Sequence, residues 1–384
     1  MVLDLKRPVP LYQQVADNIR SEILSGRMSP GNQLGSHRDL AKKYEVSLIT
    51  IKRALNDLIR DGVLYSRAGK GTFVHEISSP RVTIATKTIA LVLQDLKSPF
   101  FSLIVQSIEQ YASLKGYNLL LSNSSQQPQR EENLVRHYYE SGVSGLIIAS
   151  MSHEYTISHF LREIIDKDYP YVMVSYVKDP DVYFVGTDHE EGGYLATDHL
   201  LNLGYKTIGY IDGEPGNVVG ALRKSGYIRA HSDHDVPVPD HFLFHLGHRG
   251  EEHDYNSGYE IGKTFSESID RPRAMFIYND LAALGFEQAV MESGVRIPED
   301  VAIVGFDGIE RGEYAKVPIT TVRQPFDRIG ALAVENLVGR IEGRRVEVKT
   351  VLQPTLITRE SCGARRAAET PTELAIPQKS EATR

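Results

Sequence analysis

Residues 36–60 read SHRDLAKKYEVSLITIKRALNDLIR, and this stretch decides the fold of the N-terminal part of the chain. Ser36 and Ser47 each stand directly before a segment with helical spacing. Serine is a preferred N-cap because its hydroxyl accepts a hydrogen bond from a free N–H of the first turn. In the second segment the apolar residues recur at i, i+3, i+4 and i+7, at Ile51, Ala54, Leu55 and Leu58. The stretch predicts two helices joined by a short turn, the second with one buried face.

The residues on either side add a third helix and a hairpin. Before the stretch, apolar residues recur every four positions after Pro10, at Leu11, Val15, Ile19 and Ile23. This spacing predicts a helix. After the stretch, residues 63–65 and 72–74 have strand character and flank a glycine-bearing turn. Residues 1–75 are therefore expected to form an α+β winged helix-turn-helix domain.

Beyond residue 87 the chain alternates short apolar runs with segments of helical spacing. The runs are 89–93, 119–121, 146–149, 172–174, 208–211, 274–277 and 301–304. Continuous apolar strands separated by helices are typical of parallel sheets that helices cover on both faces. A span of about 270 residues exceeds one such sheet, so we expect two α/β lobes.

Two segments have no helical period. Residues 76–87 are rich in Ser and Thr, contain Pro80, and are interpreted as a linker. Residues 363–384 are polar and aperiodic, and we expect a disordered tail there.

Charge is unevenly distributed along the chain. The formal net charge is −7, yet the first 79 residues hold twelve Lys and Arg against eight Asp and Glu. A basic head on an acidic body is expected where one segment neutralises phosphates and the rest stays soluble. Apolar residues make up 41% of the chain, which excludes disorder throughout.

Cys362 is the only cysteine, which excludes an intrachain disulfide and a cysteine-based zinc finger. The N-terminus lacks the apolar run of a signal peptide, and no run of about 18 apolar residues occurs. We therefore expect a cytoplasmic protein with no membrane partner.

Residues 10–74 contain several short motifs in order. They are Pro10-Leu11-Tyr12-Gln13-Gln14, Leu34 with Ser36 and Arg38, Val46-Ser47 with Thr50 and Lys52, and Gly69-Lys70-Gly71-Thr72-Phe73-Val74. With these motifs, residues 8–75 resemble the GntR-type winged helix. The resemblance implies double-stranded operator DNA as a partner, with contacts from Arg38, Thr50, Lys52, Gly69, Lys70 and Gly71. Ser47, which caps the helix, and Leu48 and Arg53, which lie off its buried stripe, are further candidates for DNA contact.

Two residues depart from the GntR pattern. Gly35 stands where the family usually has proline, and Leu48 stands where it usually has an arginine that touches DNA. Leu48 offers an apolar contact instead, for example to a thymine methyl group. The operator preference of the family therefore cannot be transferred to this chain.

A second set of motifs covers residues 88–362. They include Ile89-Ala90-Leu91-Val92, Ser98-Pro99-Phe100-Phe101, Gly192-Gly193-Tyr194-Leu195-Ala196, Asn279-Asp280, Val304-Gly305-Phe306-Asp307, and Thr320-Thr321-Val322 with Gln324. This region resembles LacI/GalR-type effector domains, which implies the two-lobed α/β fold of periplasmic sugar-binding proteins. We expect lobe 1 at about 88–186 and 323–349, and lobe 2 at about 187–322 and 350–362.

The second resemblance implies a small sugar as effector. A sugar needs polar side chains for its hydroxyls and an aromatic wall for its ring. The family pattern carries hydrogen-bonding roles to Arg223, Asn279, Asp307 and Gln324. Phe100 and Phe101 would supply the wall, and the further candidates are Ser98, Tyr176 and Asp188.

A histidine cluster and a glycine-bearing segment do not indicate further sites. Six of the 13 histidines lie between His231 and His253, but His241 and His245 in an extended segment would be about 13 Å apart, too far for one metal ion. Residues 258–264 resemble a phosphate-binding loop that is one residue short, and an ordinary helix start is favoured. No catalytic motif appears, so we expect neither a metal, nor a cofactor, nor an enzyme.

The combination of the two parts resembles the arabinose-responsive repressor group. The hypothesis is a repressor of carbohydrate-utilisation genes that dimerises through the effector domain and leaves its operator when a sugar binds. L-arabinose or another pentose is the first candidate effector. The alternatives are a sugar-responsive activator and a regulator with a non-sugar effector; a transporter component and a carbohydrate enzyme fit the sequence less well.

Overall fold

The computed structural model describes residues 10–24, 28–29, 31–60, 63–67, 70–75, 87–96, 98–149, 157–174, 181–247 and 251–364. The chain divides into two compact units, Met1–Thr83 and Ile84–Arg384, called here the head and the body. Nearly all of the expected linker, and the expected tail from residue 365, lie outside the described residues.

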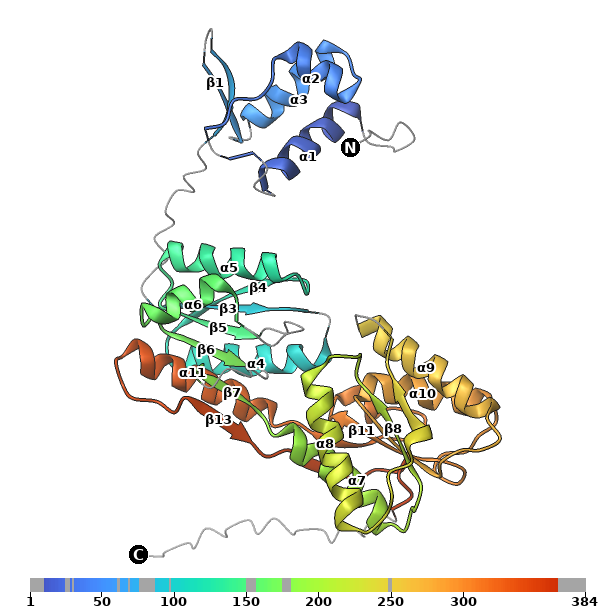
Figure 1. The fold of residues 1–384 in the computed structure, drawn as a ribbon. Helices are drawn as coiled ribbons and strands as arrows, with labels where there is room; N and C mark the ends of the chain where they lie inside the picture. The colour runs from blue at the N-terminus through green and yellow to red at the C-terminus, as the bar shows by residue number, and fades with distance from the viewer. Residues whose placement is uncertain are drawn as a thin grey trace, which may run out of the picture. The chain divides into compact units, whose positions relative to one another are not determined.

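The described residues of the head form three helices and one hairpin, drawn in blue in Figure 1. The elements are α1 (Leu11–Leu24), α2 (His37–Tyr44), α3 (Leu48–Arg60), β1 (Leu64–Arg67) and β2 (Gly71–Val74). Both expected caps are present. Ser36 and Asp39 form a reciprocal capping box, and the Ser47 hydroxyl accepts from the backbone N–H of Thr50 at 3.1 Å. The two serines therefore fix where α2 and α3 begin.

The apolar stripe of α3 forms the centre of the head. Its members Ile51, Ala54, Leu55 and Leu58 are buried, together with Val15 and Ile19 of α1. The hairpin differs slightly from expectation, because β1 runs on to Arg67, which pairs with Gly71. The turn is therefore shorter than the sequence indicated.

The first lobe of the body is a six-stranded parallel sheet in the order β13-β7-β6-β5-β3-β4. The strands are β3 (Thr88–Leu93), β4 (Asn118–Asn123), β5 (Gly145–Ala149), β6 (Tyr171–Val174), β7 (Phe184–Thr187) and β13 (Lys349–Leu352). One face packs on α4 (Pro99–Leu114) and α11 (Phe326–Ile341), the other on α5 (Pro128–Ser141) and α6 (His159–Asp166). Both faces are covered, as the continuous apolar runs predict.

The second lobe is a six-stranded sheet in the order β14-β12-β11-β10-β8-β9, in which only β14 is antiparallel. The strands are β8 (Ile208–Asp212), β9 (Leu243–His245), β10 (Ala274–Ile277), β11 (Ala302–Asp307), β12 (Thr320–Arg323) and β14 (Thr355–Ile357). Helices α7 (His189–Asn202) and α8 (Val218–Asp233) cover one face, and α9 (Glu251–Glu267) and α10 (Asp280–Glu292) cover the other (Figure 1).

The chain crosses between the lobes three times: after β7, after β12 and after β13. The first two crossings lie close to the expected boundaries. The third lies later than expected near residue 350, because Lys349–Leu352 pair with Phe184–Thr187 and so extend the first sheet. These crossings place the carboxyl ends of several strands from both sheets around one space.

Residues 258–264 and two of the clustered histidines have other structural roles. Residues 258–264 lie inside α9, where a Cβ on Gly258 would overlap the carbonyl oxygen of Ala282; this glycine serves helix packing. His241 and His245 approach different carboxylates, Asp270 and Asp212. Within the described part of the chain, no group of His, Cys, Asp and Glu is arranged to hold a metal ion. None of the described helices combines the length and apolar character that a membrane span requires.

Candidate functional site

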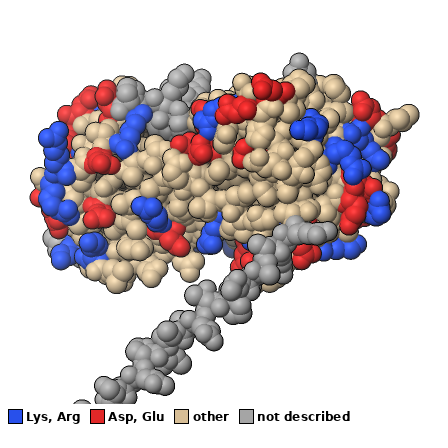
Figure 2. All heavy atoms as spheres, turned by 90° about the horizontal axis from the view of Figure 1, so that it is seen from below, with Lys and Arg blue, Asp and Glu red and all other residues tan. Residues whose placement is uncertain are grey.

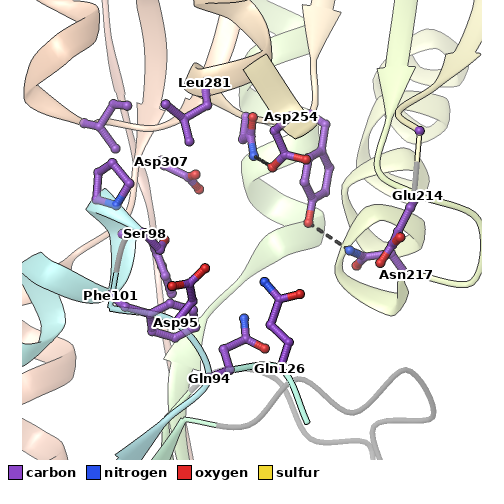
Figure 3. A pocket seen from close by; sticks show the side chains of 16 residues that line it. Gln94, Asp95, Ser98, Phe101, Gln126, Glu214, Asn217, Asp254, Leu281 and Asp307 are labelled. Carbon is purple, nitrogen blue, oxygen red and sulfur yellow. Dashed lines mark hydrogen bonds between the residues drawn. The ribbon is translucent and has the colours of Figure 1, made fainter. Parts of the chain in front are cut away.

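A cleft of about 160 Å³ lies in the body and is lined from both lobes (Figure 3). The first lobe contributes the segment after β3 and the segment after β4: Gln94, Asp95, Ser98, Pro99, Phe100, Phe101 and Gln126. The second lobe contributes Glu214, Asn217, Gly247, Asp254, Tyr278, Asn279, Leu281, Asp307 and Ile309. Most of these residues follow the carboxyl ends of parallel strands, where open α/β sheets bind ligands.

Asp307 ends β11 and lines the cleft in an unusual backbone conformation. Its φ of 108° lies in the region that favours glycine, and such strain in a non-glycine residue marks functional positions. One carboxylate oxygen accepts from Gln324 Nε2 at 2.8 Å and from Arg223 Nη2 at 3.3 Å. Burial raises the pKa of Asp307, whereas Arg223 and Gln324 favour its ionised form.

Arg223 stands behind Asp307 and does not itself line the cleft. Its side chain is only 4% exposed, and its guanidinium also donates to the carbonyl of Tyr278. The guanidinium carbon lies 3.6 Å from the ring centroid of Phe306, and Nε is buried with no hydrogen-bond partner. A buried cation fixed in this way orients Asp307 and holds its charge beside the cleft.

Asn279 caps α10 and reaches a second carboxylate. Its Oδ1 accepts from the N–H of Ala282 at 2.9 Å, and its Nδ2 donates to Asp254 Oδ2 at 2.7 Å. Burial raises the pKa of Asp254 to about 6, although the bond from Asn279 opposes the shift. Asp307, Asn279 and Asp254 therefore form a row of hydrogen-bonding groups on the second lobe.

The other candidates predicted for the cleft divide into two groups. Ser98 and Phe100 line the cleft, and Phe101 does so while its side chain is 3% exposed and belongs mainly to the core of the first lobe. Gln324 is 2% exposed and lies behind Asp307. Asp188 does not line the cleft; it caps α7 by accepting from the N–H of Glu191 at 3.0 Å.

Tyr176 lies outside the described residues. Sequence reasoning overlooked several polar residues of the cleft, namely Gln94, Asp95, Gln126, Glu214, Asn217 and Asp254. Gln94 and Asp95 directly follow the first apolar run, so the signal used for Ser98 applied to them as well. Asn217 is the N-cap of α8 and donates to the hydroxyl of Tyr278 at 3.0 Å.

In the head, α3 exposes the face opposite its buried stripe. Leu48, Lys52 and Arg53 are exposed there, and Arg38 is exposed in the first turn of α2. Thr50 is half-buried and its hydroxyl lies 2.8 Å from that of Ser47. On the face of the molecule drawn in Figure 2, by contrast, basic and acidic side chains are interspersed.

Arg53 and the hairpin turn add detail to this surface. The Arg53 guanidinium carbon lies 4.0 Å from the ring centroid of Tyr12, so this side chain makes a cation–π contact within the head. Lys70 and Gly71 are exposed, and the Lys70 carbonyl accepts from the side-chain amide of Gln33 at 2.7 Å. Gly69 lies outside the described residues.

Comparison with known proteins identifies both parts. Residues 11–74 match the gntR family of bacterial regulatory proteins, and residues 197–362 match the periplasmic binding protein-like domain. An arabinose metabolism transcriptional repressor of Geobacillus stearothermophilus is 32% identical over 366 residues, which cover 93% of this chain and 98% of that protein. This chain belongs to the family of the arabinose metabolism transcriptional repressors.

A second arabinose metabolism transcriptional repressor, from Halalkalibacterium halodurans, is 28% identical over 91% of this chain and 96% of its own length. Among solved structures, a LacI-family transcriptional regulator of Enterococcus faecium with bound ribose has a TM-score of 0.61 and 28% identity, covering 72% of this chain and 98% of that one. As a member of this repressor family, the protein is a transcriptional regulator that joins a GntR-type head to a LacI-type body.

Proposed function

We propose that this regulator represses carbohydrate-utilisation genes and leaves its operator when a small sugar occupies the cleft. L-arabinose or another pentose is the first candidate sugar. Two arabinose metabolism repressors cover nearly the whole chain, and a structural neighbour of the body holds ribose. Both facts support a pentose.

The proposal rests on the residues that line the cleft. Asp307, Asn279 and Asp254 line the cleft from the second lobe and offer hydrogen-bonding groups, and Ser98 and Phe100 line it from the first. Figure 3 shows Asp307 and Asp254 at the same cleft as Ser98. A sugar has adjacent hydroxyls that both donate and accept, and its ring has apolar faces. A ligand held by both lobes favours their closure, which provides a conformational signal.

The proposal includes the assembly of the regulator. The body forms a homodimer, and the two heads bind the half-sites of a palindromic operator, because two-fold protein symmetry matches two-fold operator symmetry. The proposed domain limits are 1–75 for the head and 88–362 for the body. The protein acts on DNA in the cytoplasm and performs no catalysis.

Thermal-shift measurements on the full-length protein test the effector class. The panel contains L-arabinose, D-ribose, D-xylose and D-glucose, together with purines and amino acids. A pentose is expected to raise the Tm of the wild type and to leave the Tm of Asp307→Ala unchanged. Asp188→Ala is the matched control and should keep the shift, because Asp188 caps α7 outside the cleft. A shift with a purine or an amino acid, and none with sugars, would overturn the proposal.

A further inference from the structure

The first turn of α3 exposes two large apolar side chains. Ile49 is 79% exposed and Leu48 is 45% exposed, whereas the neighbouring Ile51 is fully buried. Among the described residues of the head, these are the only large apolar side chains with such exposure. They contribute little to the core of the head, and an exposed apolar pair of this kind indicates a surface that a partner covers.

The positive charges exposed on α2 and α3 favour a polyanion as the partner. The Ser47-capped N-terminus of α3 carries partial positive charge, and Lys52 is exposed one turn further along the same face. Arg38 and Lys42 of α2 are exposed as well. A protein or membrane partner would match the apolar pair but gains less from these exposed cations, whereas duplex DNA surrounds its base edges with phosphates.

The chemistry of the major groove then limits what the pair can touch. Base edges there present hydrogen-bond donors and acceptors, and the C5-methyl group of thymine is the apolar exception. Neither Ile49 nor Leu48 can form a side-chain hydrogen bond. Arg53, on the same face, partly engages Tyr12, with its guanidinium carbon 4.0 Å from the ring centroid.

We propose that Ile49 and Leu48 form an apolar edge that reads thymine methyl groups in each operator half-site, with Ile49 as the main contact. This inference rests on the proposed binding of operator DNA through α3. It assigns sequence discrimination to two residues that lack polar groups. Lys52 and Arg38 then act mainly in holding the duplex.

A methyl-deletion scan tests the inference. The full-length protein first selects its preferred duplex from a random pool, and each thymine of that duplex is then replaced singly by deoxyuridine, which removes only the methyl group. Fluorescence anisotropy at constant salt gives the Kd of each duplex. Removing one buried methyl group from a contact is expected to weaken binding about fourfold at one or more positions per half-site.

Variants assign the effect to the side chains. Ile49→Ala should bind the thymine duplex more weakly and lose most of the difference between thymine and uracil at the sensitive position; Leu48→Ala should lose a smaller part. Ile269→Ala is the matched control, because this fully exposed isoleucine lies in the body, and it should behave as the wild type.

The outcomes separate this inference from the proposed function. A selected duplex whose half-sites tolerate every uracil replacement would overturn the inference while leaving operator binding intact. A uracil effect that persists in both Ile49→Ala and Leu48→Ala would also overturn the inference. Failure to select any preferred duplex would instead contradict the proposed function.

Discussion

Gln324 joins Asp307 to the first lobe. Its Nε2 donates to Asp307 Oδ1 at 2.8 Å, and its Oε1 accepts from the Thr187 hydroxyl at 2.7 Å. Thr187 ends β7, where the chain first leaves the first lobe, and Gln324 follows β12, where the chain returns. Asp307 lines the cleft and is hydrogen-bonded to Gln324. Gln324 in turn bonds Thr187, so this contact connects the two segments in which the chain passes between the lobes.

Removing this contact should weaken the sugar response more than sugar binding. Thr187→Val keeps the shape of the side chain but deletes the donor to Gln324, so we expect sugar affinity within about threefold of wild type and a smaller sugar-induced loss of operator affinity. Calorimetry with L-arabinose and anisotropy with operator DNA measure the two quantities. Thr197→Val, which removes a hydroxyl bonded to Gly193 within α7, should retain the response. A full response in Thr187→Val would contradict the role of the contact.

Replacing Arg223 should abolish sugar binding and destabilise the body. Arg223→Ala leaves the Asp307 carboxylate buried without its cation, and breaking a buried pair typically costs about 3 to 5 kcal/mol. We expect no heat of L-arabinose binding and a lower Tm. Arg229→Ala, on the same helix, removes the exposed pairs with Glu190 and Glu191 and a guanidinium contact with the Tyr194 ring, and it should change the Tm little. Equal effects of the two variants would argue against a special role for Arg223.

Asp254 should make stability depend on pH. Burial raises its pKa from 3.8 to about 6, so the native state holds this proton more tightly than the unfolded chain. Its contribution to stability is fully present below about pH 4 and is lost as the pH rises through about 6. Asp254→Asn should therefore raise the unfolding free energy at pH 7.5, on the order of 1 to 3 kcal/mol, and give a smaller difference at pH 4.

Urea unfolding at a series of pH values measures the effect of Asp254→Asn. Asp300→Asn is a control of opposite sign, because the side chain and backbone N–H of Arg296 hold the pKa of Asp300 well below its usual range. That variant should lose stability at neutral pH and less at low pH. A stability difference for Asp254→Asn that does not change with pH would exclude the ionisation of Asp254 as its cause.

The packing of α7 on α8 gives a prediction about stability. A Cβ on Gly193 would overlap the carbonyl oxygen of Arg223, so Gly193→Ala must separate the two helices and displace Arg223. We expect a Tm lower by several degrees and weaker sugar binding. In Gly35→Ala the added Cβ meets Asp39 Cβ at an ordinary 3.5 Å, and the Tm should stay within about a degree of wild type. Thermal unfolding followed by circular dichroism compares the two variants. An unchanged Tm in Gly193→Ala would show that α7 and α8 can move apart without a loss of stability.

The sequence predicted those elements that local patterns determine. Ser36 and Ser47 mark helix starts, and the stripe from Ile51 to Leu58 marks a buried face, because caps and helical spacing act over a few residues. Strands β7 and β12 were overlooked, since they are four residues long and their sequences, FVGT and TTVR, contain polar or glycine positions. Their burial follows from neighbouring strands that are distant in the chain.

The cleft was predicted only in part, because contacts between segments distant in the chain complete it. Asp307 ends a buried strand and Asn279 follows another, and the structure places both at the cleft. An acidic residue after a strand suits ligand binding and helix capping equally well, and local backbone geometry makes Asp188 a cap. Asp254 lies on α9, and only the packing of α9 against α10 brings it to Asn279.

A sugar titration of the operator complex measures whether a filled cleft releases DNA. Operator DNA is bound to the full-length protein, L-arabinose or the pentose found in the panel is added, and anisotropy gives the operator Kd while calorimetry confirms that the cleft is filled. We expect that filling the cleft weakens operator binding about 5- to 150-fold in the wild type and not in Asp307→Ala. An operator Kd that stays constant with the cleft filled would contradict it.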